Sequence, residues 1–437
     1  MSSSVPAPVP APDDDVERLI ASLGRAQLAA GYPVNEVNDT LAAVARAYDR
    51  PDLQIYVLPN AVFVDNETNG RARIVAGDIG TLRLDQAAEV HRVARNASIA
   101  AIPPAAATKR LEEINDLKPR FSAVTVVVAN GFTAAGFALV FRVSLWGVLI
   151  AGILGVFVAI ALRLTASRPG LSAIMPFFAA AVAAYVVFTI GNIFDEQVQP
   201  IRVVAAPLIT LIPGVGLTRG TQELANGQLI SGSSRLVNAI MQILVLTFGV
   251  LVGARLAPID DYTFGDLTDV LLPWWAAWIG VLVFAVGQSM VSNEARGGIR
   301  IVVGLLIVAY GIQSLVAATI DPVLAAGLAA AATLFLAILY QRRSRQGMPA
   351  FALFEPVFWL LVPGSLGLVA LTEVFAGRDK ALPGPESSDS SVFSLGAGTD
   401  VLFVAAATII AITIGMVIAS ALGRLIPSVL PKAAEVA

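Results

Sequence analysis

Ten apolar segments follow Arg120, and they constrain the fold more than any other feature of this sequence. Each is long enough, allowing for tilt, to cross a hydrocarbon core roughly 30 Å thick. Hydrophobic residues make up 56% of the chain and charged residues 14%, which is far from the composition of a water-soluble globular protein. We therefore predict a polytopic α-helical membrane protein with spans near residues 121–141, 145–166, 171–194, 201–217, 236–257, 270–290, 301–320, 322–340, 350–371 and 401–422.

Charged residues are concentrated before the first span. Residues 1–120 hold 29 of the 61 Asp, Glu, Lys and Arg residues. Helical patterns and short β-rich runs such as LQIYVL, AVFVD and ARIVAG predict a small α+β domain over residues 16–120. The preceding MSSSVPAPVPAPDDD has neither the basic start nor the apolar core of a signal peptide, so residues 1–15 are predicted to be a disordered tail.

Loop charges predict the orientation of the spans, because Lys and Arg in short loops favour the cytoplasmic side of a membrane. If the N-terminal domain is cytoplasmic, most basic loop residues fall on the inside. The exceptions are Arg142, Arg202, Arg255, Arg378 and Lys380. With ten spans, residues 423–437 then form a cytoplasmic tail.

One unusual stretch occurs twice. LIPGVGLTRGTQELANG, residues 211–227, is followed 150 positions later by LVPGSLGLVALTEVFAG, residues 361–377, with Leu, Pro, Gly, Glu and the final Gly in register. The same shift relates the earlier spans to the later ones, apart from an insertion of about sixteen residues before the last span. We predict two five-helix repeats, residues 121–257 and 270–422. An odd number of spans per repeat makes them inverted, as in many secondary transporters; chance similarity is the alternative.

The paired Pro-Gly steps are the first candidate site. Pro213 with Gly214, and Pro363 with Gly364, interrupt apolar runs and free backbone groups that lipid cannot satisfy. We expect both breaks near the middle of the bilayer, reached from opposite faces. The following half-helices would direct positive ends at that region, which suits a solute with a carboxylate. The alternative is a simple kink or helix end.

Three carboxylates are the second group of candidates. Glu223 and Glu373 follow the two breaks at equal spacing, and Arg219 stands one helical turn before Glu223, where it can pair with it. Glu355 lies among apolar residues in FALFEPVFW, and an intramembrane carboxylate is a candidate for proton coupling or amine binding. All three could instead be interfacial residues.

Other functional classes lack support in the sequence. There is no cysteine, one histidine, no phosphate-binding loop and no nucleophile constellation, so we predict neither an enzyme nor a cofactor or metal site. The net charge of −3 offers no basic surface for nucleic acid. Transport would draw on an ion gradient or on the gradient of the solute itself.

Several motifs resemble the bacterial threonine/serine exporter family. They are AAGYPVNEVNDTLAAVARAY, IYVLPNAVFVD, LIPGVGLTRGTQELANGQLISG followed by RLVNAIMQILVLTFGVLVG, and the second LVPG. The most specific part is the Pro-Gly segment with its downstream acid and the glycines Gly227 and Gly232. The resemblance implies a proton-driven exporter of L-threonine and L-serine in the bacterial cytoplasmic membrane, with a cytoplasmic domain ahead of ten spans. The second copy departs from the family pattern between Ser365 and Glu373.

Three readings of function therefore remain open. The first is a proton-coupled exporter of small hydroxy amino acids that binds its solute between the two broken helices. Relatives split into two chains are associated with dicarboxylate export, so a succinate-type solute is the second. A passive channel or a membrane scaffold is the third, and the sequence leaves open whether the chain forms a homo-oligomer.

Overall fold

A computed structural model describes residues 12–66, 70–76, 82–193, 200–258, 271–295, 297–343, 348–361 and 397–425. Three predicted site residues, Pro363, Gly364 and Glu373, lie outside the described residues. The same is true of residues 1–11 of the predicted tail and of nearly all of the insertion before the last span.

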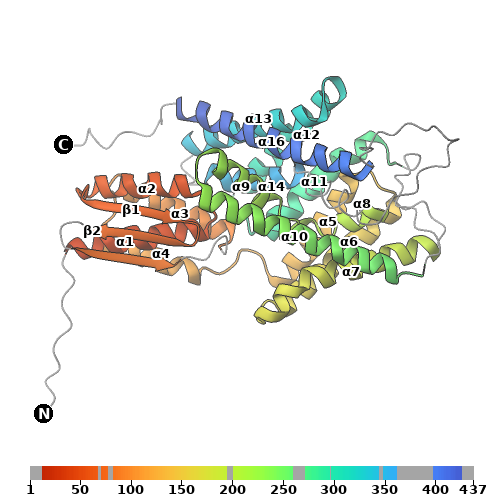
Figure 1. Ribbon diagram of the computed structural model, residues 1–437, viewed down its shortest axis with the longest axis horizontal. Helices are drawn as coiled ribbons and strands as arrows, with labels where there is room; N and C mark the ends of the chain where they lie inside the picture. The colour runs from red at the N-terminus through yellow and green to blue at the C-terminus, as the bar shows by residue number, and fades with distance from the viewer. Residues whose placement is uncertain are drawn as a thin grey trace, which may run out of the picture.

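The elements before the first span gather at one end of the molecule (Figure 1). Three antiparallel strands form a sheet in the order β1-β2-β3, and Leu58 pairs with Ala61 across a tight turn. Val62 and Val64 alternate with more exposed residues along the middle strand, so one face of the sheet is buried against helices. The elements are α1 (Pro12–Ala29), α2 (Val34–Ala47), β1 (Leu53–Leu58), β2 (Ala61–Asn66), β3 (Arg71–Ala76), α3 (Leu84–Ala97), α4 (Pro104–Glu113) and η1 (Ile114–Asp116).

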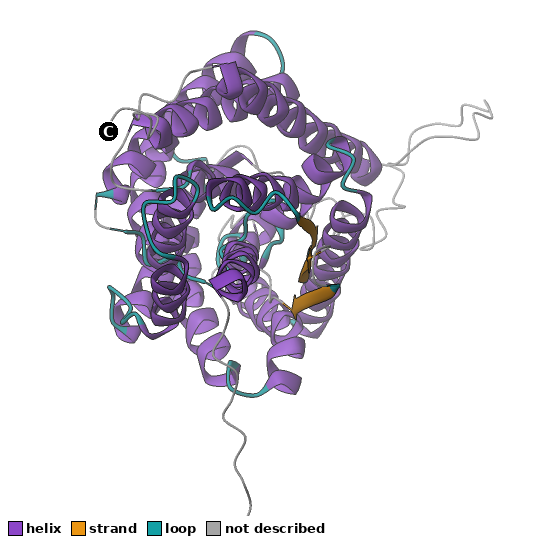
Figure 2. Ribbon diagram, turned by 90° about the vertical axis from the view of Figure 1, so that its left-hand side faces the viewer, coloured by secondary structure: helices purple, strands orange, loops and turns teal. Residues whose placement is uncertain are grey.

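Eight of the described helices are long and apolar enough to cross a membrane. Viewed from the end that carries the sheet, the outline of the long helices extends beyond that of the sheet-bearing elements (Figure 2). The eight helices are α5 (Ala123–Val140), α6 (Leu145–Thr165), α7 (Pro169–Ile193), α10 (Leu229–Leu256), α11 (Trp274–Val291), α12 (Gly298–Thr319), α13 (Pro322–Arg343) and α16 (Ala397–Leu425).

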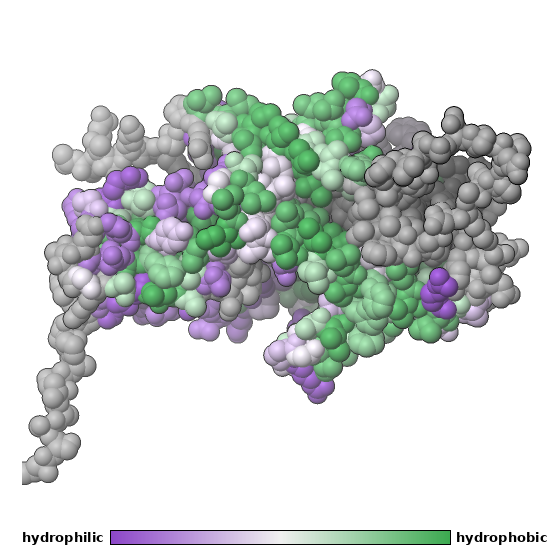
Figure 3. Space-filling model, in the orientation of Figure 1, coloured by the Kyte–Doolittle hydropathy of each residue, from purple (hydrophilic) through white to green (hydrophobic). Residues whose placement is uncertain are grey.

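The outer surface of these helices is apolar. On α6, Leu145, Leu149, Ile153 and Phe157 are all exposed and recur every four residues, so they form one stripe along the helix. Figure 3 shows hydrophobic surface over the long helices and hydrophilic residues over the sheet-bearing end. A water-soluble protein would bury such stripes, whereas a lipid bilayer solvates them. The chain is therefore a multi-pass membrane protein.

One predicted span is not a continuous helix over the residues described. The fourth, residues 201–217, consists of α8 (Pro200–Ala205), η2 (Ile209–Leu211) and α9 (Gly214–Ala225). Pro207 and Pro213 explain the interruptions, because each lacks a backbone donor and disfavours helix in the residue before it. The ninth predicted span begins as α14 (Ala350–Leu361) and then enters residues outside the description.

Candidate functional site

Protein contacts satisfy backbone groups that the helix break at Pro213 releases. The chain leaves η2 at Leu211, and Pro213 has the non-helical angles φ −81° and ψ 45°. The Leu211 carbonyl accepts a hydrogen bond of 2.6 Å from Gln242 Nε2 on α10, and the Thr218 hydroxyl donates to the Gly214 carbonyl. A polar side chain on a neighbouring helix thus satisfies a backbone group that the break releases, as the membrane interior requires.

The helix after the break packs very closely on α10. Gly227 follows α9 with φ +79°, a conformation that favours glycine, and it lets the chain turn into α10. A Cβ added to Gly232 would lie 2.7 Å from the Gly220 carbonyl oxygen. These two contacts explain the glycine spacing in the sequence motif: Gly227 makes the turn, and Gly232 allows the backbones of α9 and α10 to approach.

Glu223 lies at the end of α9 and is almost completely buried, with 1% of its side chain exposed. Its Oε2 atom lies 3.0 Å from Arg235 Nε on α10 and accepts a hydrogen bond from the Ser231 hydroxyl. Its Oε1 atom accepts a hydrogen bond of 3.3 Å from the backbone N–H of Val34, the first residue of α2. One carboxylate thus joins α9, α10 and the sheet-bearing end.

Arg219 pairs with a residue far away in the sequence. Its Nη2 atom lies 3.8 Å from Glu355 Oε2 on α14, and its guanidinium lies 3.8 Å from the centre of the Phe351 ring. The arginine side chain is 8% exposed and that of Glu355 is 28% exposed. Arg219 also lies close enough to Glu223 for their charges to interact, but the ion pair of Glu223 within 4 Å among the described residues is with Arg235, because α10 brings a second arginine to it.

The Arg219 guanidinium also lies against the sheet-bearing end. A Cβ added to Gly31 would lie 2.6 Å from Arg219 Nη1, and Gly31 has φ +81°. The backbone angle therefore favours glycine at this position, and a larger side chain would also displace the arginine. Gly31 and Val34 both belong to one motif of the predicted family resemblance, and Arg219 and Glu223 belong to the other. The two motifs contact each other in space.

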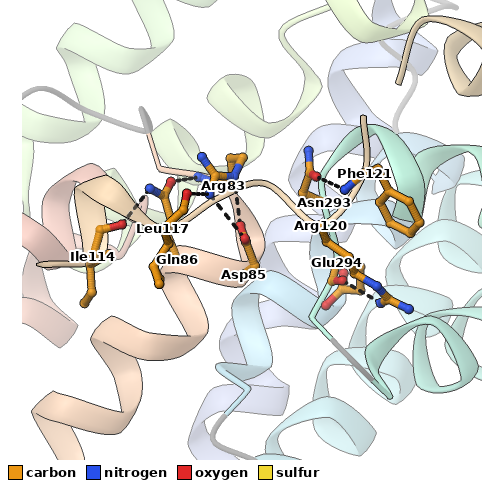
Figure 4. Close-up of polar contacts among 9 residues, drawn as sticks. All are labelled: Arg83, Asp85, Gln86, Ile114, Leu117, Arg120, Phe121, Asn293 and Glu294. Atoms are coloured by element: carbon orange, nitrogen blue, oxygen red, sulfur yellow. Dashed lines mark hydrogen bonds and ion pairs between the residues drawn. The ribbon is translucent and has the colours of Figure 1, made fainter. Parts of the chain in front are cut away.

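A second connection joins this end to the segment between α11 and α12 (Figure 4). Arg120 Nη1 donates to the Glu294 carbonyl at 3.0 Å, and the Phe121 N–H donates to Asn293 Oδ1 at 3.1 Å. The Leu84 N–H, at the start of α3, donates to the Ser292 carbonyl. These hydrogen bonds fix the segment after α11 against α3 and the approach to α5.

The Glu294 side chain is buried in this segment, with 2% of the residue exposed, and its Oε2 has no hydrogen-bond partner among the described residues. Burial, and then the negative charge of Glu355, raise its pKa to about 8. Arg120 and the Ala295 backbone oppose this shift, while Asp85 adds to it. Glu294 therefore exchanges a proton in the physiological pH range, although it lies between membrane helices rather than within one.

The predicted site residues are thus partly brought together. Pro213 precedes α9 and Gly214 is its first residue, Glu223 lies in its last turn, and Glu355 contacts it through Arg219. Sequence reasoning missed Glu294, because VSNEARGGIR is typical of a solvated loop between two spans. It also missed Arg235, because nothing local indicates that a basic residue near the start of a long helix turns toward Glu223.

Comparison with known proteins identifies the family. The ThrE family model, whose description proposes threonine/serine export for its members, matches residues 18–257. A threonine/serine exporter from Corynebacterium glutamicum is 22% identical over 59% of this chain and 53% of its own length. Pheromone-regulated membrane protein 10 of Debaryomyces hansenii is 25% identical over 55% of this chain and 24% of its own length. Pheromone-regulated membrane protein 10 of Eremothecium gossypii is 26% identical over 64% of this chain and 38% of its own length.

The chain therefore spans between a quarter and about half of the length of these relatives. No solved structure gives a significant match. The family match covers more than half of the chain and includes the α2 motif, the Pro-Gly break and the Glu223–Arg235 pair. The chain belongs to the threonine/serine exporter family.

Proposed function

We propose that this protein exports L-threonine and L-serine across a bacterial cytoplasmic membrane by alternating access coupled to the proton motive force. The observation that carries the proposal is the pair of buried arginines on and beside the broken helix α9, each matched to a carboxylate. Such charges are costly in a membrane protein and mark transport pathways by default. Arg219 offers a cation for the carboxylate of the solute, and Glu355 is the group that it would release.

Matching helix boundaries support two five-helix repeats within this transporter. The helices α5, α6, α7 and α8 start 150 to 153 residues before α11, α12, α13 and α14. Gly249 on α10 packs on the carbonyl of Phe177 on α7, and Gly415 on α16 packs on the carbonyl of Gly327 on α13. Residues 177 and 327 differ by 150, and residues 249 and 415 by 166, which is the same shift plus the inserted residues. We take the repeats to be residues 121–257 and 270–422.

The packing of α5 on α11 supports an inverted relation between the repeats. Gly287, late in α11, packs on the carbonyl of Ala129 in the first half of α5, whereas Gly280, early in α11, packs on Val140 at the end of α5. The two helices therefore run antiparallel. Because they hold equivalent places in the two repeats, the repeats point in opposite directions, as expected for five spans each and ten in all. The two predicted broken spans would then raise the number of spans from the eight long helices to ten.

Proton coupling would use Glu355, which pairs with Arg219, together with Glu294. Glu355 lies beside Arg219, and the negative charges of Glu355 and Glu294 influence each other. Protonation of Glu294 would relieve this repulsion and change how firmly Glu355 holds Arg219. With residues 16–120 and the C-terminal tail in the cytoplasm, both carboxylates belong to the cytoplasmic half of the pathway. The cytoplasmic location follows the positive-inside distribution of loop charges.

The proposal is tested with the purified protein in lipid vesicles that carry an imposed proton gradient. We expect uptake of labelled L-threonine and L-serine into vesicles whose interior is acidic relative to the outside, and little uptake when a protonophore abolishes the gradient. Uptake of succinate in place of both amino acids would assign the dicarboxylate function instead. Equal flux with and without the gradient would assign a passive channel.

Export should also depend on pH through Glu294. A raised pKa means that the side chain is neutral below about pH 8 and negative above it. We expect the transport rate to change with a midpoint near pH 8 on the cytoplasmic side, and Glu294→Gln to remove this step. Because the pKa is raised in the folded protein, folding favours the protonated side chain. The stability that this contributes is fully present below the ordinary carboxyl pKa and is lost as the pH rises through about 8.

The matched control is Glu89→Gln on α3, since Glu89 forms a partly exposed pair with Arg92 near the same segment. This variant should keep the wild-type pH profile. A Glu294→Gln protein whose profile matched the wild type across pH 6.5 to 9 would show that Glu294 does not carry the coupled proton.

A further inference from the structure

A cavity of about 290 Å³ lies where the sheet-bearing end meets the membrane helices. Its walls come from α2, α9, α13, α14 and α16, and Figure 1 shows α2 beside α9. Ligand pockets for drug-sized molecules have volumes of roughly 300–1,000 Å³, so this cavity suits a small ligand. It is separate from the contact between Arg219 and Glu355, although Phe351 touches both the cavity and the arginine.

The cavity wall is rich in hydrogen-bond acceptors. Gln222 is 7% exposed, and its Oε1 atom has no hydrogen-bond partner among the described residues. Asn35 Oδ1, which lines the cavity from α2, is also buried without such a partner. The carboxylates of Glu36 and Asp39 line the same wall as Asn35. Buried acceptors normally find a donor, so the two unsatisfied amide oxygens of Asn35 and Gln222, close to the carboxylate of Asp39, favour a ligand that donates hydrogen bonds.

The cavity also carries positive charge on another wall. Arg342 reaches it from the last turn of α13, whereas the acidic residues come from α2. Tyr32 contributes a hydroxyl held 3.0 Å from His91 Nδ1. Burial lowers the pKa of His91 to about 4, so this histidine is neutral at physiological pH. A ligand with an ammonium group at one end and a carboxylate at the other matches this separation of charge.

We propose that this cavity is a loading site for the zwitterion of a small amino acid. The ammonium group binds among Glu36, Asp39 and the amide oxygens of Asn35 and Gln222, and the carboxylate faces Arg342. The proposal deepens the proposed function and rests on it for the identity of the solute.

A ligand in the cavity would contact the broken helix α9 through Gln222. Gln222 precedes Glu223, whose carboxylate accepts the Val34 N–H of α2, so a ligand bridging α2 and Gln222 strengthens the same junction. The sheet-bearing end thereby forms one wall of a binding site instead of acting only as an attached domain. Solute would reach the α9 break after passing this junction.

Calorimetric titration of the purified full-length protein tests the site with four probes. We expect L-threonine and L-serine to bind, and N-acetyl-L-threonine and threonine methyl ester to bind about tenfold more weakly or not at all, because each lacks one of the two charges. Asp39→Asn and Gln222→Leu should each weaken threonine binding by about tenfold. Glu112→Gln, on the exposed face of α4, should leave it unchanged.

Asp39 is exposed at the surface of the cavity, so Asp39→Asn is expected to fold, and its thermal stability provides the check. Wild-type affinity in both cavity variants, or N-acetyl-L-threonine binding as tightly as threonine, would overturn the loading site. Either result combined with normal vesicle export would leave the proposed function standing. Normal binding at the cavity without proton-driven export would instead refute the exporter and retain the site.

Discussion

Replacing Arg219 by alanine is expected to reduce export in proton-loaded vesicles to about 1% of the wild-type rate or less. The change leaves Glu355 without its cation and removes the guanidinium that packs on Phe351. Loss of a charged hydrogen-bond donor to the solute carboxylate costs up to about 3 kcal/mol, and a loss of about 3 kcal/mol corresponds to a factor of about 100. The measurement is the initial rate of labelled threonine uptake at equal amounts of inserted protein.

Two further variants separate charge from packing at this position. Arg219→Lys keeps the charge but loses the planar stacking on the ring, so it should retain partial export. Combining Arg219→Glu with Glu355→Arg restores an opposite pair at 219 and 355, which should recover folding without recovering export, because the cation no longer stands on α9. Full activity in Arg219→Ala would remove Arg219 from the transport pathway.

The second large effect concerns stability. Glu223→Gln should lower the free energy of unfolding by about 3–5 kcal/mol, because it leaves Arg235 buried without a negative partner. Arg235 is 9% exposed and lies 3.0 Å from the carboxylate, which also binds Ser231 and the Val34 backbone. Thermal unfolding of the detergent-solubilised protein, followed by intrinsic fluorescence, measures the loss.

A paired substitution shows whether this carboxylate is a structural clamp or a coupling group. Glu223→Gln combined with Arg235→Gln removes both charges, and it should recover most of the lost stability because neither charge is left buried alone. We expect Glu355→Gln to lose less stability than Glu223→Gln and to reduce export strongly, because Glu355 is partly exposed, lies 3.8 Å from Arg219, and leaves the guanidinium its contact with the Phe351 ring. Equal destabilisation by both single variants would contradict this division of roles.

The sequence was most informative where a property acts locally. Apolar length predicted the long membrane helices, because lipid leaves a hydrophobic chain few alternatives to helix. Pro213 predicted the break correctly, because proline lacks the backbone donor that a continuous helix needs. The prediction for the second break concerns Pro363 and Gly364, outside the described residues, and it stays a prediction.

Pairing of charges could not be read in the same way. The spacing of Arg219 and Glu223 is that of a helical pair, yet each side chain points to a residue supplied by another helix. Glu355 is 136 positions from Arg219, and no periodicity links them. Glu294 looked like an ordinary loop acid because its burial comes from α3 and from the segment before α5, which only the folded chain brings to it.

The hydrogen bond from Val34 to Glu223 has a consequence for how the protein can be divided. The donor lies before the first membrane helix and the acceptor lies after the third. Cutting the chain near Arg120 would therefore leave the Val34 amide of one half unsatisfied and would expose the Glu223–Arg235 pair of the other half to solvent. Separately expressed halves should therefore assemble with each other. The junction would act as a subunit interface, held by Gly31, Val34, Arg219 and Glu223.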